Sequence, residues 1–391
     1  MHGQTWEALA TPVTGQQPIR AMKKALLFSA DPGIPLLGPS GSSAHLRGVH
    51  QALQAHAFDV HVAIPQREDQ RGSFDEAVGY EITTRAYVQP RGWGRWRDRA
   101  EMRHGRALAA AALQQCPNVE LIWERFSLFC DGGVRIAKQQ RKAGRPIVHI
   151  IELNSPIIEE RGTIRSMPFA RKKRREILHS ADHVVAVSQW LRDWAIHEIG
   201  CAPHKVHYIP NGTALKPSKQ RDLWREKWQL HGTVVGFVGS MKPWHGLEQV
   251  LRIAENEPTF TFLIIGEGPQ DIPAHPRIRH MGRLNGQQLA HAIACFDVAI
   301  APYSPDSPPY FCPLKVVDYL SQGVPVVATR TGDCPHLVFG DRGQCLISDD
   351  PVKWKQALHK WAAHRVPPYV RPWSTVVSEA LSAAGVSASP P

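Results

Sequence analysis

The sequence predicts an α/β protein of two doubly wound domains that face each other across a cleft, and three observations carry this prediction. The chain has 391 residues, which is long for one typical domain and suits two. Short apolar runs alternate with helix-period patterns, as in the βαβ units of a parallel sheet. This alternation starts at Ala25, stops over residues 213–231 and starts again at Thr233.

The first half of the chain supplies one such domain. It opens with a strand, a loop dense in Gly, Pro and Ser over residues 31–43, a helix and a second strand. A loop at the carboxyl end of a first strand is a usual ligand position in open α/β sheets. We expect strands over Ala25–Ser29, Val60–Ile64, Val119–Trp123, Pro146–Leu153, Val184–Val187 and Val206–Ile209, and helices over Ala44–Ala55, Asp131–Arg141, Lys172–His179 and Ser188–Ile199.

The second half repeats the pattern. A glycine-bounded loop, Gly239–Gly246, again follows the first strand. Gly323 stands where a helix C-cap glycine belongs, and the apolar run after it suits a strand covered on both faces. We expect strands over Thr233–Val238, Phe260–Ile265, Val298–Ala301 and Val324–Ala328, and helices over Leu247–Ala254, Gln287–Cys295, 313–322, Trp354–His364 and Ser374–Ala384.

These patterns divide the chain into five parts. We expect a flexible N-terminal tail over 1–21, an N-terminal domain over 22–212, a linker over 213–231, a C-terminal domain over 232–365 and a tail with a helix over 366–391. No apolar run approaches the ~18 residues that a membrane helix needs, and the start does not read as a secretion signal. Seven cysteines without metal-ligand spacing indicate reduced thiols and a cytoplasmic protein.

The net charge of +11 is concentrated in two runs, Arg91–Arg106 and Arg165–Arg175, which interleave basic residues with Trp or Phe. Such runs suit an anionic membrane surface, a nucleic acid or an acidic substrate, although they also occur as solubilising faces. No recognised nucleic-acid-binding module is present. We therefore expect no nucleic-acid partner, and we expect peripheral contact of these runs with the anionic inner face of a membrane.

A possible phosphate cradle lies in the second half. Lys315 falls in the first turn of its helix, where the helix dipole disfavours a cation unless an anion is bound beside it. Asp318 is one turn further on and could accept hydrogen bonds from sugar hydroxyls, unless this stripe is an ordinary solvated face. Lys242 and His245 share the glycine loop. Together with Lys315 they could hold two phosphates, although His245 could equally cap its own helix.

No DxD pair and no cluster with metal-ligand spacing is present. We therefore expect no metal and no other cofactor, with the charge of a diphosphate leaving group met by cationic side chains and helix dipoles. Glu267 follows a strand and could contact a ribose or a base, or could simply be a solvated turn carboxylate.

With these residues in view, the chain resembles the GT-B glycosyltransferases, specifically the retaining family 4 type. The resemblance covers residues 25 to about 380 and rests on DPGIPLLGPSGSSAHLR, LIWERFSLF, IIELNSPIIEER, VVAVSQWLRD, YIPNG, VGFVGSMKPWHGLE, LIIGEGP and PLKVVDYLSQGVPVVA. It implies two Rossmann-like domains, a nucleotide-diphosphate sugar donor (UDP-sugar favoured) on the C-terminal domain and an acceptor on the N-terminal one. It also implies that the C-terminal helix crosses back to the first domain.

The resemblance also implies roles for individual residues. The two glutamates that family members often carry fall on Tyr310 and Asp318, and the usual Arg and Lys of the glycine loop fall on Ser240 and His245, so the sugar contact must differ. Lys242, His245 and Lys315 would stabilise the leaving diphosphate. The nucleotide sugar would be bound by Gly41, Ser42, Gly239, Ser240, Glu267, Tyr310, Phe311, Cys312, Pro313, Leu314 and Asp318, and the acceptor by His45, Glu152 and Asn154.

Other functions stay open at this point. A sugar-nucleotide epimerase shares the two-domain architecture, and a binding-only member would also be compatible with Tyr310 and Ser240. The sequence names no acceptor, and the basic runs are compatible with a lipid-linked one.

Overall fold

The computed structural model describes residues 23–38, 40–66, 79–88, 95–156, 167–304, 307–347 and 349–387. The predicted flexible tail lies outside these residues, as do residues 91–94 and 165–166 of the two basic runs. No helix within the described ranges combines the length and the apolar character that a bilayer crossing requires.

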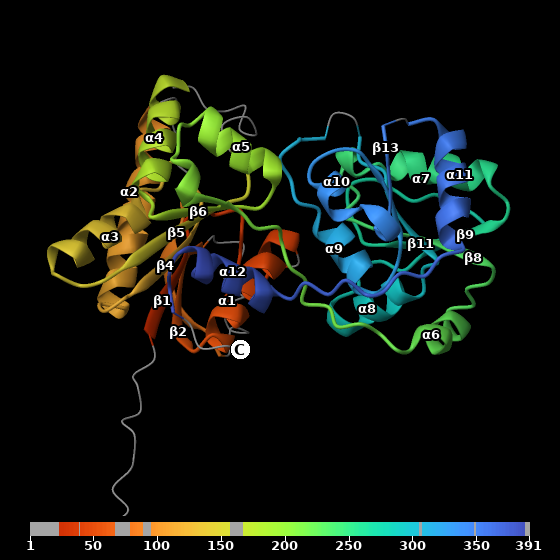
Figure 1. The fold of residues 1–391 in the computed structure, drawn as a ribbon, viewed down its shortest axis with the longest axis horizontal. Helices are drawn as coiled ribbons and strands as arrows, with labels where there is room; N and C mark the ends of the chain where they lie inside the picture. Colours follow the sequence, from red (N-terminus) through yellow and green to blue (C-terminus); the bar gives the residue numbers. More distant parts are fainter. Residues whose placement is uncertain are drawn as a thin grey trace, which may run out of the picture.

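The N-terminal domain is built on one parallel sheet (Figure 1), in which the described strands follow the order β3-β2-β1-β4-β5-β6-β7. Helices pack on the faces of this sheet, as expected of βαβ connections. The strands are β1 (Lys23–Ser29), β2 (Phe58–Gln66), β3 (Glu81–Ala86), β4 (Leu121–Arg125), β5 (Val148–Leu153), β6 (His183–Ala186) and β7 (Val206–Tyr208). The helices are α1 (Gly41–Ala55), α2 (Arg95–Gln115), α3 (Gly132–Lys142), α4 (Met167–Ser180) and α5 (Gln189–His197), with a 3-10 turn η2 at Pro203–Lys205.

The C-terminal domain has a second parallel sheet, with the described strands in the order β10-β9-β8-β11-β12-β13. These strands are β8 (Thr233–Val238), β9 (Phe260–Ile265), β10 (Ile278–His280), β11 (Val298–Ala301), β12 (Val326–Thr329) and β13 (Gly343–Leu346). The helices are α6 (Arg221–Lys227), α7 (Leu247–Asn256), α8 (Gly286–Ala294), α9 (Leu314–Ser321), α10 (Cys334–Leu337) and α11 (Pro351–Ala362), with 3-10 turns η3 (Pro243–His245) and η4 (Gly340–Arg342). Two doubly wound sheets confirm the predicted fold class.

The last helix, α12 (Trp373–Ala383), packs on α1 of the N-terminal domain (Figure 1). Trp373 fits against the α1 backbone at Gly48, where an added Cβ would lie 2.3 Å from the indole ring. The segment before α12 runs beside the start of the linker, because Thr213 and Pro372 form an isolated parallel bridge. The chain therefore crosses twice between the domains, and the two crossings touch.

Candidate active site

Each sheet has a point where the strand order changes direction, and in open α/β sheets ligands bind at the carboxyl ends of the strands that flank such a point. In the C-terminal sheet these strands are β8 and β11, followed by the glycine loop Gly239–Gly246 and by Tyr303. In the N-terminal sheet they are β1 and β4. The predicted basic residues lie at the first of these two places.

Lys315 reaches from the first turn of α9 to the ends of β8 and β11. Its Nζ lies 4.5 Å from the ring centroid of Phe237 and 4.9 Å from that of Tyr303. This atom is buried and has no hydrogen-bond partner in the part of the chain that the structure describes. Burial lowers the pKa of the ammonium group to about 7. An anion beside this amine would offset the cost of burying its charge.

His245 ends the turn η3 and lies close enough to Lys315 for the lysine charge to affect the protonation of the imidazole. Burial, followed by the positive charges of Lys315 and Lys242, lowers the pKa of the imidazole to about 3. The ring is therefore neutral near pH 7. The sequence had suggested that it would be cationic. Its buried Nδ1 has no hydrogen-bond partner among the described residues. A neutral imidazole can give or accept one hydrogen bond toward a ligand.

Lys242 is exposed at the start of η3, and its Nζ lies 5.9 Å from the ring centroid of Trp244. Trp244 stacks on Tyr303 at 5.9 Å and packs against Phe311 at 5.6 Å. These rings line the same corner as Lys315. The three predicted basic side chains thus come together at the carboxyl ends of β8 and β11.

The predicted loop residues meet at the neighbouring strand ends. Gly266 and Gly268 allow two loops to touch, since an added Cβ would lie 1.8 Å from the carbonyl oxygen of Gly239 and 1.9 Å from that of Ser240, respectively. Ser240 and Glu267 are both exposed beside this contact. Both side chains are thus accessible to a ligand at the loop tips.

Gly41 and Ser42 begin α1 on the N-terminal domain, and Gly41 faces the start of α9. An added Cβ at Gly41 would lie 3.1 Å from Cδ1 of Leu314, and Leu314 packs against the core cluster of the N-terminal domain. Ser40 caps α1 and contacts the Ser42 hydroxyl at 2.8 Å. The first glycine loop and the N-terminal end of α9 therefore touch across the domain boundary. No side chain in the described ranges caps α9, whose N-cap is Pro313.

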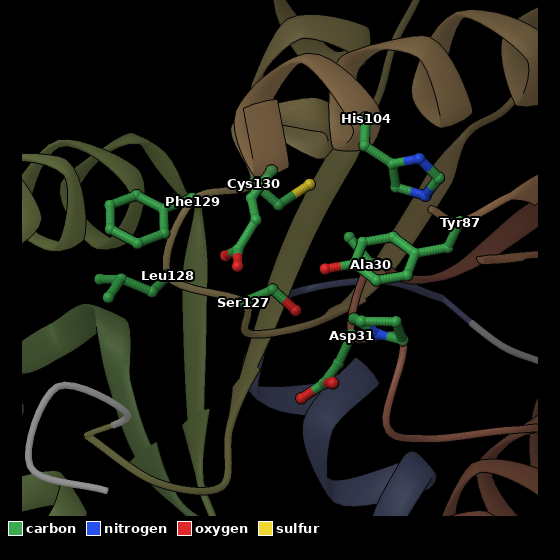
Figure 2. A pocket seen from close by; sticks show the side chains of 10 residues that line it. Ala30, Asp31, Tyr87, His104, Ser127, Leu128, Phe129 and Cys130 are labelled. Carbon is green, nitrogen blue, oxygen red and sulfur yellow. The ribbon is translucent and has the colours of Figure 1, made fainter. Parts of the chain in front are cut away.

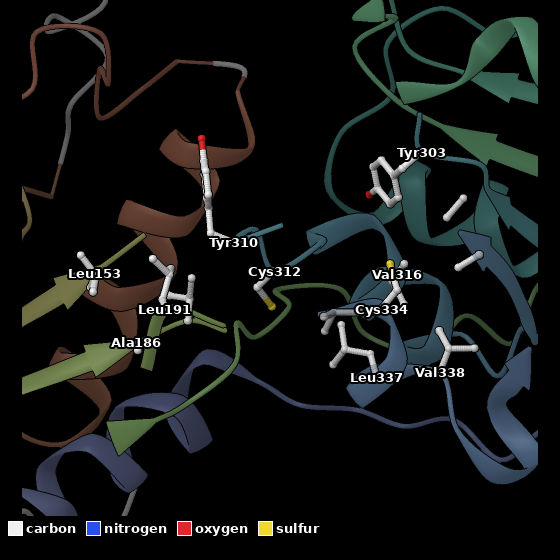
Figure 3. Packing of buried hydrophobic residues seen from close by; sticks show 14 of the residues in the cluster. Leu153, Ala186, Leu191, Tyr303, Tyr310, Cys312, Val316, Cys334, Leu337 and Val338 are labelled. Carbon is white, nitrogen blue, oxygen red and sulfur yellow. The ribbon is translucent and has the colours of Figure 1, made fainter. Parts of the chain in front are cut away.

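Tyr310 and Cys312 belong to the domain interface (Figure 3). They lie in one apolar cluster with Leu191 of the N-terminal domain and Cys334 of the C-terminal one. The Ser188 hydroxyl donates to the carbonyl of Tyr310 at 2.8 Å. Both side chains are over 90% buried, with 7% and 8% of the surface exposed. They help to join the domains, and their predicted contact with a nucleotide sugar remains a prediction.

Asp333, which the sequence did not single out, ties the domains together beside this cluster. Its carboxylate accepts hydrogen bonds from the Gln189 amide at the start of α5 (3.1 Å) and from the Tyr208 hydroxyl (2.6 Å). Burial raises the pKa of Asp333. An Asp at the start of a helix usually caps its own chain, so its sequence position gave no sign of a partner in the other domain.

Glu152, His45 and Asn154, the predicted acceptor ligands, form a polar network inside the N-terminal domain. His45 Nε2 lies 2.7 Å from Glu152 Oε1, and the Asn154 amide donates to the same oxygen at 2.5 Å. The Trp123 indole donates to Oε2 at 2.9 Å. Burial would raise the pKa of Glu152, but the charge and hydrogen bond of His45, with the charge of Arg125 and the Asn154 bond, lower it to about 2. Only 3% of the Glu152 and His45 surface is exposed, so any acceptor contact falls mainly to Asn154.

A small cavity of about 20 Å³ lies at the other strand-order change, between the ends of β1 and β4 (Figure 2). Figure 2 shows His104 of α2, Tyr87 and Ser127 around it. The buried atoms His104 Nε2 and Ser127 Oγ have no hydrogen-bond partner within the described ranges. The space suits about one water-sized polar group. The helical spacing of Leu108, Ala109 and Ala112 could have revealed α2 in the sequence and, with it, His104.

Two family models match the chain. The model described as Glycosyltransferase Family 4 matches residues 39–216, and the model described as Glycosyl transferases group 1 matches residues 232–364. The first match includes β2 to β7 of the N-terminal sheet and the second includes all of the described strands of the C-terminal sheet, so each domain is matched by one model.

Individual known proteins are similar over parts or all of the chain. The Bacillus subtilis teichuronic acid biosynthesis glycosyltransferase TuaH is 27% identical over 199 residues, which is 47% of this chain and 49% of that protein. The chain thus spans about half the length of this curated relative. Anabaena HepE in complex with UDP and glucose has a TM-score of 0.61 and 17% identity, over 93% of this chain and 95% of that one. The UDP-GlcNAc 2-epimerase of Neisseria meningitidis has a TM-score of 0.55 and 14% identity, over 92% and 100%. At these identities the two structures show a shared fold.

Proposed function

Because the chain belongs to the GT-B glycosyltransferases of the family 4 type, we propose that it transfers a sugar from a UDP-sugar to a hydroxyl group of an acceptor, with retention of anomeric configuration. The observation that carries the proposal is the buried ammonium of Lys315, which has no hydrogen-bond partner among the described residues and lies beside His245 at the strand-order change of the C-terminal sheet.

The donor diphosphate would lie against Lys315, His245 and Lys242. The two lysines supply positive charge, and His245 supplies a neutral N–H or a lone pair. The N-terminal end of α9, which no side chain in the described ranges caps, adds backbone N–H groups and a favourable dipole. These groups stabilise the negative charge that develops as the sugar–phosphate bond breaks. The donor phosphate itself helps to take the proton from the attacking hydroxyl.

This arrangement lets the protein work without a divalent ion, because lysine charge and backbone amides do what a metal would otherwise do. Phe311, Pro313 and Leu314 would border the nucleotide sugar, with Gly41 and Ser42 on the facing domain. The acceptor would bind on the N-terminal domain, where Asn154 and the polar cavity around His104 and Ser127 offer hydrogen-bonding groups.

We expect UDP to stabilise the protein more than GDP, ADP or TDP in a thermal-shift panel. A ligand at about 100 times its Kd stabilises by about 2.7 kcal/mol, which a melting curve resolves easily. With a UDP-sugar and an extract that contains acceptors, the labelled sugar should move to a new compound whose anomeric configuration matches that of the donor. EDTA should leave this transfer unchanged.

The same measurement separates the alternatives. An epimerase would return a free nucleotide sugar of altered configuration, and a binding-only protein would be stabilised by UDP yet leave the donor intact. Loss of transfer on adding EDTA, with recovery on adding Mg²⁺, would contradict the metal-independent mechanism.

We also propose that the protein docks on an anionic membrane, where its acceptor is lipid-linked. Trp96, Arg99 and Arg103 are exposed along α2, and Arg171 and Lys172 are exposed on α4. Met102 of α2 and Ala170 of α4 belong to one core cluster, and we take the exposed side chains of these two helices together as the docking surface. Arg174, by contrast, is buried against Trp194, with its guanidinium 4.6 Å from the ring centroid, and does not belong to this surface.

The protein should float with phosphatidylglycerol vesicles at low salt and much less with phosphatidylcholine vesicles, since each basic side chain near such a surface contributes about 1 kcal/mol. The double variant Arg99→Glu/Arg103→Glu should lose most of this binding. Arg252→Glu/Lys353→Glu makes the same change in net charge on exposed residues of the C-terminal domain and should keep it. Equal loss of vesicle binding in both double variants would show that the binding depends only on the net charge of the protein.

A further inference from the structure

The stripe of α9 that carries Asp318 is bound along its length by the linker. The Thr213 hydroxyl donates to Asp318 Oδ1 at 2.6 Å. One turn later, Gln322 accepts from the Ser218 amide at 2.8 Å and donates to the Lys216 carbonyl at 3.2 Å. The face predicted from the spacing of Lys315, Asp318 and Gln322 is thus divided, with Lys315 directed toward the strand ends and the other two held by the linker.

The direction of the Thr213–Asp318 hydrogen bond is fixed by a second contact. Thr213 Oγ1 accepts a hydrogen bond from the Leu215 amide at 3.0 Å, so its own proton is available for the carboxylate. The 2.6 Å distance is typical of a hydroxyl that donates to an ionised oxygen. The other oxygen, Asp318 Oδ2, accepts no hydrogen bond from any residue that the structure describes. One carboxylate oxygen is therefore anchored, and the other is left for a ligand.

Thr213 is itself held where the two interdomain crossings touch. Its amide donates to the carbonyl of Arg371 at 2.8 Å, and its backbone forms the bridge to Pro372. Gly212 before it leaves no room for a side chain, since an added Cβ would lie 2.9 Å from the Arg371 carbonyl oxygen. Arg371 in turn makes a bidentate bond to Glu379 of α12. The position of the Thr213 hydroxyl thus depends on the linker and on the segment that leads to α12.

We propose that Thr213 is a positioning residue that orients Asp318 toward the ribose hydroxyls of the nucleotide and so couples nucleotide affinity to the interdomain crossing. This inference rests on the proposed function, because it takes the ligand to be a nucleoside diphosphate. Burial raises the pKa of Asp318 to about 6 even though the Thr213 bond opposes the shift. Without the hydroxyl, the carboxylate would be both less ionised and free to rotate away.

The test compares two ligands that share phosphates but differ in the nucleoside. Thr213→Val keeps the shape of the side chain and removes the hydroxyl, and we expect it to weaken UDP binding in calorimetry about tenfold, as the loss of a hydrogen bond to a charged group does. Inorganic pyrophosphate contacts only the basic cluster, so its affinity should not change. Thr213→Ser restores the hydroxyl and should bind UDP within about twofold of wild type. In the Asp318→Asn background, Thr213→Val should cause no further loss of UDP affinity, because Thr213 acts on the nucleotide only through the Asp318 carboxylate.

Unchanged UDP affinity in Thr213→Val, or an equal loss of UDP and pyrophosphate binding, overturns this inference and leaves the proposed function standing. A wild-type protein that binds pyrophosphate but no nucleoside diphosphate overturns both. Thr213→Ala serves as a second variant without the hydroxyl if the valine variant does not fold, and the same outcomes apply to it.

Discussion

Replacing Lys315 with methionine is expected to abolish most of the transfer activity and, at the same time, to make the protein more stable. Methionine fills the same space between Phe237 and Tyr303 without a charge. Loss of one preorganised group that stabilises a leaving anion typically costs about 10²–10³-fold in rate. We expect kcat/KM for the donor to fall by that amount.

The gain in stability follows from the sign of the pKa shift. Lysine has a pKa near 10.4 in an unfolded chain, whereas burial lowers that of Lys315 to about 7 in the folded protein. Between pH 7 and 10 the unfolded chain therefore binds more protons, and the free energy of unfolding of the wild type rises with pH in this window. Each pKa unit corresponds to about 1.4 kcal/mol, so the buried ammonium costs a few kcal/mol near neutral pH. The Lys315→Met variant has no buried ammonium and therefore does not bear this cost in its free energy of unfolding.

The pH profile of donor use supplies an independent check. Only the charged amine attracts a diphosphate, so kcat/KM for the donor should fall as pH rises above about 7 in the wild type. Lys315→Met should lack this limb.

Urea unfolding at pH 7 and pH 9, together with donor kinetics, measures both effects. Lys353→Met, on the exposed face of α11, is the matched control and should change neither quantity. Near-normal turnover in Lys315→Met, or a loss of stability together with activity, would contradict the assignment of Lys315 to the phosphate site.

Strands were predictable from sequence where they are buried on both faces. The predicted bounds of Thr233–Val238, Phe260–Ile265 and Val298–Ala301 match β8, β9 and β11, since each is a continuous apolar run. The edge strands β3, β10 and β13 read EITTRA, IRH and GQCL, and their short or mixed sequences carry no such signal. Partner strands, rather than composition, hold these segments extended.

The helix α2 was missed for a different reason. Its first half coincides with the basic run that includes Trp96 and Arg106, and the frequent charged residues in this run obscure the helical period of its apolar positions. In the structure Arg106 forms a bidentate bond to Asp131, the N-cap residue of α3, and is therefore partly structural. The linker also contains a helix that was not identified, α6, which packs on α8.

In the candidate site, too, the sequence predicts what depends on the local helical period and does not predict what depends on tertiary contacts. Spacing alone predicted that Lys315, Asp318 and Gln322 share a face of α9, because this depends only on the helical period. Spacing could not predict that the linker would bind Asp318 and Gln322, or that burial would make His245 neutral. Those properties arise from which loops surround each side chain, and they decide its charge and its free hydrogen-bonding groups.

Glu152→Gln is expected to destabilise the N-terminal domain strongly. The Glu152 carboxylate is buried and contacts four side chains from three parts of the fold: His45 of α1, Trp123 and Arg125 of β4, and Asn154 after β5. His45 in turn packs on Trp373 of α12, with the ring centroids 4.5 Å apart. Removing one partner of a buried charged network typically costs 3–5 kcal/mol, because the remaining charges stay buried without compensation.

The free energy of unfolding rises with pH here too, as it does for Lys315, but in an acidic window and because the charged form of Glu152 is stabilising. The pKa of Glu152 is lowered to about 2 in the folded protein, below the value near 4.3 of an unfolded glutamate. Its stabilising contribution is therefore fully present above about pH 5 and is lost as the pH falls toward 2. The difference in free energy of unfolding between wild type and Glu152→Gln should be largest near neutral pH and should shrink on acidification.

Urea unfolding between pH 3 and 7 measures this difference, with Glu176→Gln as the control. Glu176 pairs with Lys173 on the surface of α4, where an exposed ion pair contributes at most about 1 kcal/mol. If Glu152→Gln proved as stable as this control but lost affinity for the acceptor, Glu152 would act by direct contact, as the sequence suggested. If stability falls while the UDP affinity of the folded fraction is unchanged, the carboxylate acts by holding α1, β4 and β5 in register. The acceptor would then meet only the rim of this network, at Asn154.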